Sequence, residues 1–215
     1  MVTRAHLNSD DGVLCYDPTL YRSIVGALQN LTFTRPDIEY AINQVYQFMH
    51  QPLDCHFKTV KRILRYLRGT LNYGLDIHGG SIPSLLIYSD ADWAGCPSTR
   101  CSTTGFCLFL GSTMVSWSSK KQATVSHSSA KAEYRDVAHS VAELDWLMSL
   151  LSELGISFPS LLMVLCDNIS VLNVSYVPTH DQLADFFTKS LSSDRFHSLC
   201  SNLEIGDPPA SIAGG

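Results

Sequence analysis

Acidic residues stand next to several predicted elements of this chain, where their carboxylates could hold divalent cations. The candidates are Asp90, Glu133, Asp167 and Asp181. Apolar runs at residues 85–88 and 161–166 predict buried strands that end at Asp90 and Asp167. A carboxylate at the end of a rigid strand is well placed to bind a cation. Mg²⁺ prefers carboxylate and phosphate oxygens, so these acids predict a magnesium site.

Each acid also has an ordinary structural interpretation. Asp90 and Asp167 could be polar strand ends before turns, Glu133 could stabilise a helix N-terminus, and Asp181 could cap a following helix. The metal hypothesis depends on their occurring together, because clustered carboxylates repel one another unless cations offset the charge. Two Mg²⁺ ions could do this, activate a water and stabilise the leaving oxygen in phosphodiester cleavage.

The elements that would position these acids form an α/β pattern with a mixed sheet over residues 84–203. The strand at Asp90, a strand at residues 103–110 and one at residues 114–119 predict an antiparallel meander. A helix is predicted from residue 129 to 154, with an apolar stripe at Tyr134, Val137, Val141, Leu144, Met148 and Leu151. The strand after it should lie parallel to an earlier one and bring Asp167 to the sheet edge of Asp90.

A smaller helical domain is predicted at residues 20–80, after an irregular segment at residues 1–19. Its third helix runs from Asp54, as N-cap, to Gly69, as C-cap, and residues 71–78 are expected to form a strand. The helix carries a third of the chain's 15 Lys and Arg, which are Lys58, Lys61, Arg62, Arg65 and Arg68. Such a face is either solvated or a contact surface for phosphates. Residues 204–215 are expected to be a disordered tail.

Composition limits the classes of function. The net charge of −5 gives no general attraction to nucleic acid, so binding would need a local basic patch. The seven Cys form no CxxC pair, which argues against structural zinc and favours reduced thiols in an intracellular protein, cytoplasmic or nuclear. No signal peptide and no membrane-spanning run is evident. No feature indicates a particular protein partner.

Long sequence motifs resemble the Pol polyproteins of copia-type retrotransposons, from about residue 14 to 203. The first part is similar to the end of a reverse transcriptase, at YRSIVGAL (21–28), TRPDI (34–38) and KRILRYLRGT (61–70). The second part is similar to the ribonuclease H domain, at YSDADWAG (88–95), STTGF (102–106), VSWSSKKQ (115–122), AEYR (132–135), CDN (166–168) and HDQLADFFTK (180–189).

This resemblance implies a ribonuclease H-like domain preceded by a helical thumb or connection remnant. It implies that Asp90, Glu133, Asp167 and Asp181 bind two Mg²⁺ ions and hydrolyse RNA in RNA–DNA hybrids, with Asp92 and Asp185 as the alternatives within their motifs. The RNA strand would be recognised through its 2′-hydroxyls. The basic helix would contact the duplex backbone. His180 is either a proton shuttle or a loop residue without such a role.

The sequence also departs from the family pattern. The polymerase palm is absent, so no polymerase activity is expected. The family has a helix and a strand between Asp167 and Asp181, whereas this chain has a short linker. A parallel crossover needs about a dozen residues, so residues 174–177 are predicted either to continue the Asp167 strand or to lie at the sheet edge without parallel pairing. Lys131, Asp136 and Cys101 are smaller departures. The alternative functions are an inactive retroelement remnant with at most nucleic-acid binding, and a protein-interaction domain.

Overall fold

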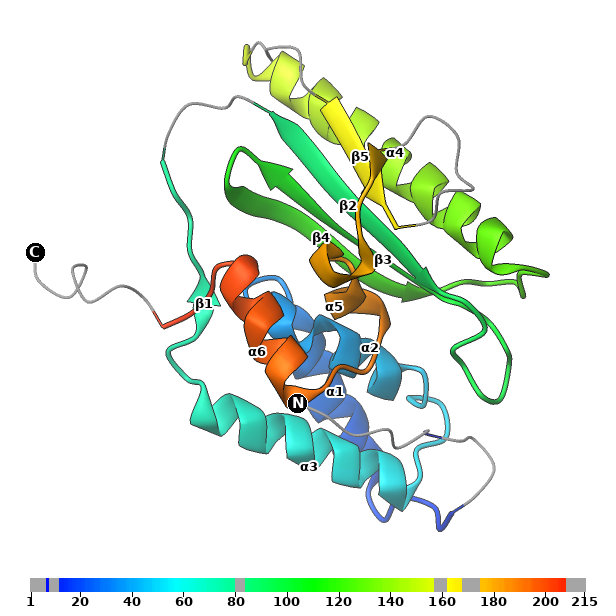
Figure 1. Cartoon of the computed structure of the whole chain (residues 1–215). Helices are drawn as coiled ribbons and strands as arrows, with labels where there is room; N and C mark the ends of the chain where they lie inside the picture. The colour runs from blue at the N-terminus through cyan, green and yellow to red at the C-terminus, as the bar shows by residue number, and fades with distance from the viewer. Residues whose placement is uncertain (1–6, 8–11, 80–83, 157–161, 168–174, 208–215) are drawn as a thin grey trace, which may run out of the picture. The chain divides into compact units, whose positions relative to one another are not determined.

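The computed structural model of the chain describes residues 7, 12–79, 84–156, 162–167 and 175–207, and it divides into two compact units (Figure 1). The helical unit comprises Met1–Asp76 with Ser190–Gly215, and the sheet unit comprises Ile77–Lys189. This division differs from the domain bounds expected from the sequence. Residues 190–203, which we expected in the second domain, group with the N-terminal helices, since Phe196 packs edge-on against Tyr66.

The helical unit is built from helices whose apolar positions follow the predicted periods. It contains α1 (Pro18–Leu31), the 3₁₀ turn η1 (Pro36–Ile38), α2 (Glu39–Tyr46), α3 (Asp54–Gly69) and α6 (Ser193–Asn202). Asp17 caps α1 by accepting a hydrogen bond from the Leu20 backbone N–H. The buried faces of α1, η1, α2 and α3 form one apolar core that includes Tyr21, Val25, Ile38, Ile42, Val45, Val60 and Ile63.

Several sequence predictions for this unit need correction. The N-cap of α3 is Leu53, whose N–H is accepted by His56 Nδ1, and Asp54 instead pairs with Lys58. The C-cap is Thr70, since Gly69 is still helical. The strand expected at residues 71–78 is only β1 (Gly74–Leu75), which pairs with β7 (Ile205–Gly206), so the expected tail at residues 204–215 begins with ordered residues.

The sheet unit contains a five-stranded mixed sheet in the order β4-β3-β2-β5-β6. The strands are β2 (Leu85–Asp92), β3 (Thr103–Leu110), β4 (Thr113–Lys121), β5 (Leu162–Cys166) and β6 (Ser175–Tyr176). The predicted antiparallel meander is confirmed, since β3 pairs antiparallel with both β2 and β4. The predicted parallel strand is also confirmed, because β5 pairs parallel with β2 and Ser89 stands opposite Cys166.

The prediction that residues 174–177 could not pair in parallel is wrong. β6 pairs parallel with β5, through Leu165 opposite Ser175 and Cys166 opposite Tyr176. The crossover limit applies to strands of ordinary length, which the chain must retrace in full. Here only two residues pair, so residues 167–174 need to bring the chain back by about one strand residue and across one strand spacing of about 4.8 Å.

Helix α4 (Ser129–Glu153) covers one face of the sheet, and its buried stripe is partly polar (Figure 1). Ser128 caps it by accepting from the Lys131 backbone N–H. The residues that face the sheet are Ala132, Glu133, Asp136, Ser140, Leu144, Leu147 and Leu151. The predicted stripe was therefore wrong at Tyr134, Val141 and Met148, which are exposed. Hydrophobicity alone selected the neighbouring stripe because acids and a serine occupy the true one.

The short helix α5 (Asp185–Thr188) packs on the other face of the sheet, over a glycine of β3. A Cβ at Gly105 would lie 2.6 Å from Thr188 Cγ2 and 2.8 Å from Phe187 Cβ. Phe187 and Thr188 are fully buried, so neither side chain has space to move aside. Gly105 therefore permits the close approach that brings α5 to the sheet.

Replacement Gly105→Ala is expected to lower the free energy of unfolding by about 1–3 kcal/mol, the cost typical of overpacking. The measurement is urea unfolding of both proteins followed by circular dichroism. The matched control is Gly79→Ala, because no atom lies within 4 Å of a Cβ at Gly79. Equal stability of Gly105→Ala and wild type would contradict the close packing of α5.

Candidate metal centre

Asp90 is the central acid of the site and is almost fully buried at the end of β2. Its side chain faces α5, whereas that of Ser89 faces α4, because successive strand residues point to opposite faces. Lys189 Nζ donates to Asp90 Oδ1 at 3.0 Å, and the Thr188 hydroxyl donates to Oδ2. Burial raises the pKa of Asp90 to about 6, although Lys189 and Thr188 act in the opposite direction.

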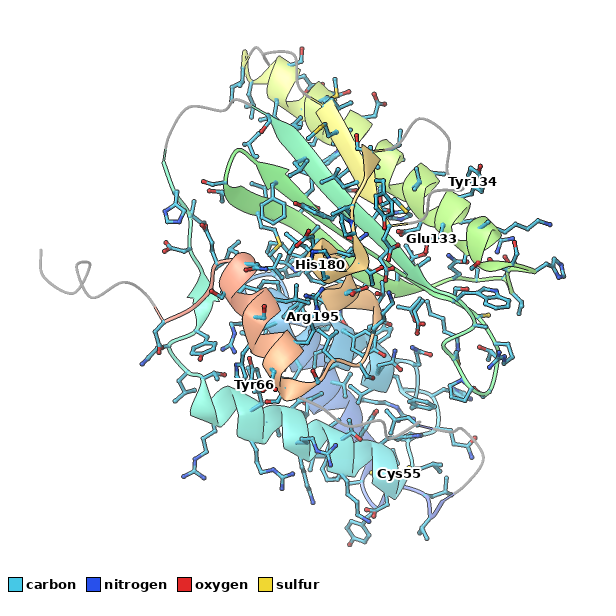
Figure 2. All side chains as sticks on the ribbon, in the orientation of Figure 1. Cys55, Tyr66, Glu133, Tyr134, His180 and Arg195 are labelled. Atoms are coloured by element: carbon cyan, nitrogen blue, oxygen red, sulfur yellow. The ribbon has the colours of Figure 1, made fainter. Side chains whose placement is uncertain are left out.

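Glu133 reaches the same strand end from the first turns of α4, whereas its neighbour Tyr134 is exposed (Figure 2). Gln122 fixes this part of α4 to β3, since its amide donates to Ala132 O at 3.1 Å and to Thr104 Oγ1 at 2.8 Å. Burial, together with the negative charges of Asp90 and Asp167, raises the pKa of Glu133 to about 8. The carboxyl is therefore set to hold a proton at neutral pH unless a cation replaces it.

Asp167 follows β5 directly and completes a group of ligand atoms with Glu133. One ligand atom each from Glu133, Cys166 and Asp167 lies within 4.8 Å of the others. Cys166 Sγ donates to Glu133 Oε2 at 3.5 Å, and Thr179 Oγ1 donates to Asp167 Oδ2 at 3.4 Å. The parallel pairing of β2 and β5 brings Asp167 to the strand end that carries Asp90, and the charges of Asp90 and Asp167 both act on Glu133.

Asp181 does not join this group, and Asp185 takes its place beside Asp90. The Asp181 side chain is 59% exposed and pairs with His180 at 3.1 Å on the 3₁₀ turn η2 (Thr179–Asp181). Asp185 is buried, and its negative charge raises the pKa of Asp90. The structure thus brings Asp185, the alternative within the same motif, beside Asp90 and leaves Asp181 exposed. The helix begins at Asp185, so that residue is the one carried to the sheet.

Two further acids lie close to the site. Asp136 is fully buried one helical turn after Glu133, and its Oδ2 accepts from the Ser89 hydroxyl, while none of the described residues donates a hydrogen bond to its Oδ1. Burial raises its pKa well above the ordinary range, and Asp90 and Glu133 raise it further. The spacing of three residues between Glu133 and Asp136 is the sequence signal that could have identified Asp136. Asp92 turns toward Gly95, where an added Cβ would lie 2.0 Å from Asp92 Oδ2.

The residues present fit a divalent cation. Buried carboxylates from β2, α4 and α5, together with the half-buried Asp167 after β5, supply the oxygen ligands that Mg²⁺ prefers, and their mutual repulsion is relieved by positive charge. Asp90, Glu133, Asp167 and Asp185 would hold it. Cys166, a softer ligand, is the one member of the nearby group that suits Mg²⁺ poorly.

The basic residues of α3 lie in the helical unit and are mostly exposed. Lys58 pairs with Asp54 at 2.9 Å, and Lys61 Nζ lies 4.8 Å from the centroid of the Phe57 ring. Arg65 and Arg68 are exposed, and Arg62 is half-buried. The face thus presents its charges to solvent, as both a solvated helix and a phosphate-binding surface would.

The raised pKa of Glu133 predicts a pH-dependent stability in metal-free buffer. The folded state binds this proton more tightly than the unfolded chain, so the free energy of unfolding falls as pH rises from about 4.5 to 8. Asp90 adds a loss of the same sign between about pH 4 and 6. Glu133→Gln removes the contribution of this carboxyl to the pH dependence. We therefore expect the variant to be more stable than wild type at pH 8, by roughly 1 kcal/mol or more, and similar in stability at pH 4.5.

Thermal unfolding in EDTA from pH 4.5 to 8 measures this difference. Glu153→Gln is the control, since Glu153 is exposed at the end of α4. If the stability of Glu133→Gln depends on pH as that of wild type does, ionisation of the Glu133 carboxyl is not the cause of the pH dependence.

Comparison with known proteins identifies relatives of the whole chain. It is 41% identical to the retrovirus-related Pol polyprotein from transposon RE2 of Arabidopsis thaliana, over all of this chain and 17% of the relative. It is 42% identical to that from transposon RE1 of the same plant, over 98% of this chain and 16% of the relative. Identity to that from transposon TNT 1-94 of Nicotiana tabacum is 40% over 72% of the chain and 12% of the relative.

The chain spans about one sixth of the length of the first two relatives. The alignment with the first covers 245 residues, against 215 in this chain, so the relative has residues in this stretch that the chain lacks. No protein-family model matches the sequence, and no solved structure gives a significant match. Within the described residues, none of the helices combines the length and the apolar character that crossing a membrane requires.

The relatives that are about 41% identical along the entire chain are therefore copia-type, retrovirus-related Pol polyproteins, and this similarity supports a retrotransposon origin of the protein.

Proposed function

We propose that this chain is a ribonuclease H-like phosphodiesterase that hydrolyses the RNA strand of RNA–DNA hybrids with Mg²⁺. The observation that carries the proposal is the convergence of acids from separate elements at one sheet edge. Asp90 and Glu133 interact electrostatically with each other, Asp167 with Glu133, and Asp185 with Asp90. The order of strands and helices that delivers them also agrees with the family motifs quoted from the sequence.

Each residue has a distinct part in this proposal. Bound Mg²⁺ would activate a water and stabilise the leaving oxygen of the phosphodiester. Asp90, at the buried centre, contributes oxygens on the α5 side, and Asp185 holds the same side from α5. Glu133 gives up its proton when it becomes a ligand, since only the carboxylate binds a metal. Asp167 is half-buried and thus more exposed than Asp90 and Glu133, so the phosphate of the substrate would approach the ions from its side.

An inactive remnant is the second candidate, and a specific observation favours it. The relatives have residues that this chain lacks, and β6 keeps only two paired residues at the sheet edge. A protein of this kind would bind nucleic acid without cleaving it.

Cleavage of a labelled RNA–DNA hybrid by the purified chain in Mg²⁺ tests the proposal. Asp90→Asn and Asp185→Asn are expected to lower the rate about a hundredfold or more, the usual cost of removing one group that stabilises transition-state charge. Asp181→Asn is expected to stay within about threefold of wild type, because Asp181 is exposed and outside the group.

Three outcomes would contradict this assignment. Equal rates for wild type and Asp90→Asn would indicate that the activity does not come from this site. Hybrid binding without cleavage by wild type would establish the inactive remnant. Loss of activity in Asp181→Asn but not in Asp185→Asn would restore the assignment made from the sequence.

We also propose that the exposed basic face of α3 binds the phosphates of the duplex. Each phosphate contact adds about one unit to the dependence of log affinity on log salt. The triple variant Lys61→Ala, Arg65→Ala, Arg68→Ala should therefore bind a hybrid more weakly and lower that slope by about three. Fluorescence anisotropy at several salt concentrations measures both quantities.

The matched control exchanges the same three residues for the other basic residue, as Lys61→Arg, Arg65→Lys and Arg68→Lys. This variant keeps the charge and should keep most of the affinity. If the alanine variant retains the wild-type slope, the basic face is solvated and does not bind the duplex.

A further inference from the structure

Lys189 occupies the position between two acids of the proposed metal centre. Its Nζ lies 3.0 Å from Asp90 Oδ1 and 2.6 Å from Asp185 Oδ1. The two carboxylates are nearly buried, with side chains 2% and 9% exposed, whereas the Lys189 side chain is 32% exposed. A positive charge therefore already neutralises this half of the site, from a side chain that can still reach solvent.

The ammonium and a divalent ion require the same oxygens. Mg²⁺ binds carboxylate oxygens at about 2.1 Å and takes ligands in a compact octahedron. Nζ lies within hydrogen-bond distance of one oxygen on each acid, and these are the two acids that would share a cation on this side of the site. Two cations cannot lie that close together on the same pair of oxygens, because their repulsion is strong where water is largely excluded.

The local structure allows Lys189 to leave. It is the C-cap of α5, with an extended backbone at φ −124° and ψ 152°, and it reaches back to Asp185 at a spacing of four residues. The lysine stem is long and flexible, so its ammonium can move into solvent without movement of the helix. Asp90 and Asp185, in contrast, are held by burial and by the packing of α5 on Gly105.

We propose that Lys189 is a displaceable internal cation that closes the Asp90–Asp185 half of the metal centre and sets the divalent-ion concentration at which this half fills. This inference rests on the proposed function. Lys189 thereby stabilises the metal-free protein and weakens binding of the ion. A merely structural salt bridge would have the opposite effect on binding, because its loss would disorder the ligands and lower the affinity.

The test is titration calorimetry with Mn²⁺ alone, together with thermal unfolding in EDTA and in saturating Mn²⁺. Lys189→Met removes the charge and keeps the length of the side chain. We expect it to bind Mn²⁺ about tenfold more tightly than wild type, since a competing unit charge a few ångströms away is removed. In EDTA at pH 8 its melting temperature should be lower by at least about 2 °C, and Mn²⁺ should raise it by more than it raises wild type.

Lys120→Met is the matched control, because Lys120 is exposed on β4 and its loss changes the net charge equally. It should bind Mn²⁺ as wild type does. The double variant Lys189→Met, Asp90→Asn should lose the increase in Mn²⁺ affinity, which would locate the ion at this pair of acids.

The outcomes separate this inference from the proposed function. Unchanged or weaker Mn²⁺ binding by Lys189→Met would overturn the inference, while hybrid cleavage that depends on Asp90 would leave the function intact. If neither wild type nor Lys189→Met binds Mn²⁺, and Asp90→Asn cleaves like wild type, the metal centre and the inference are both refuted.

Discussion

The main physical constraint on the sheet unit is the repulsion between carboxylates that are buried at one edge of its sheet. Asp90, Glu133 and Asp136 are all at most 5% exposed; Asp90 raises the pKa of Glu133, and both of these acids raise the pKa of Asp136. Burial and like charge both oppose ionisation, so these groups destabilise the fold at neutral pH unless protons, donors or cations compensate. The neighbouring structure supplies donors from Ser89, Cys166, Thr188 and Lys189.

The same constraint explains which parts of the fold could be predicted from the sequence. Strands β2, β3 and β5 are continuous apolar runs, and their order with one long helix predicted both the meander and the parallel pair. The buried face of α4 could not be found in this way, since Glu133, Asp136 and Ser140 lie on it. Hydrophobic periodicity assumes that buried positions are apolar, and a site made of buried acids violates that assumption.

The fourth acid illustrates a second limit. Asp181 and Asp185 lie in one motif at a spacing of four, and both could begin a helix. The difference arises from the turn between them. Gln182 is buried, accepts the Ala184 N–H and donates its amide to Ser89 O at 3.0 Å, so the chain is fixed to β2 before the helix starts. Asp181 is left on the exposed side of that contact, and Asp185 is turned toward Asp90.

These contacts also explain how the segment from β6 to α5 is attached to the central strands. β6 needs to contribute only two paired residues, because the Val177 N–H then donates to Cys166 O and ends the pairing at the level of the acids. From there Gln182 on Ser89, and Phe187 and Thr188 over Gly105, attach the following segment to β2 and β3. α5 is thus positioned by the central strands and does not depend on a longer edge strand. Asp185 is therefore brought to Asp90 by contacts that the described residues of β2, β3 and the segment from Gln182 to Thr188 make themselves.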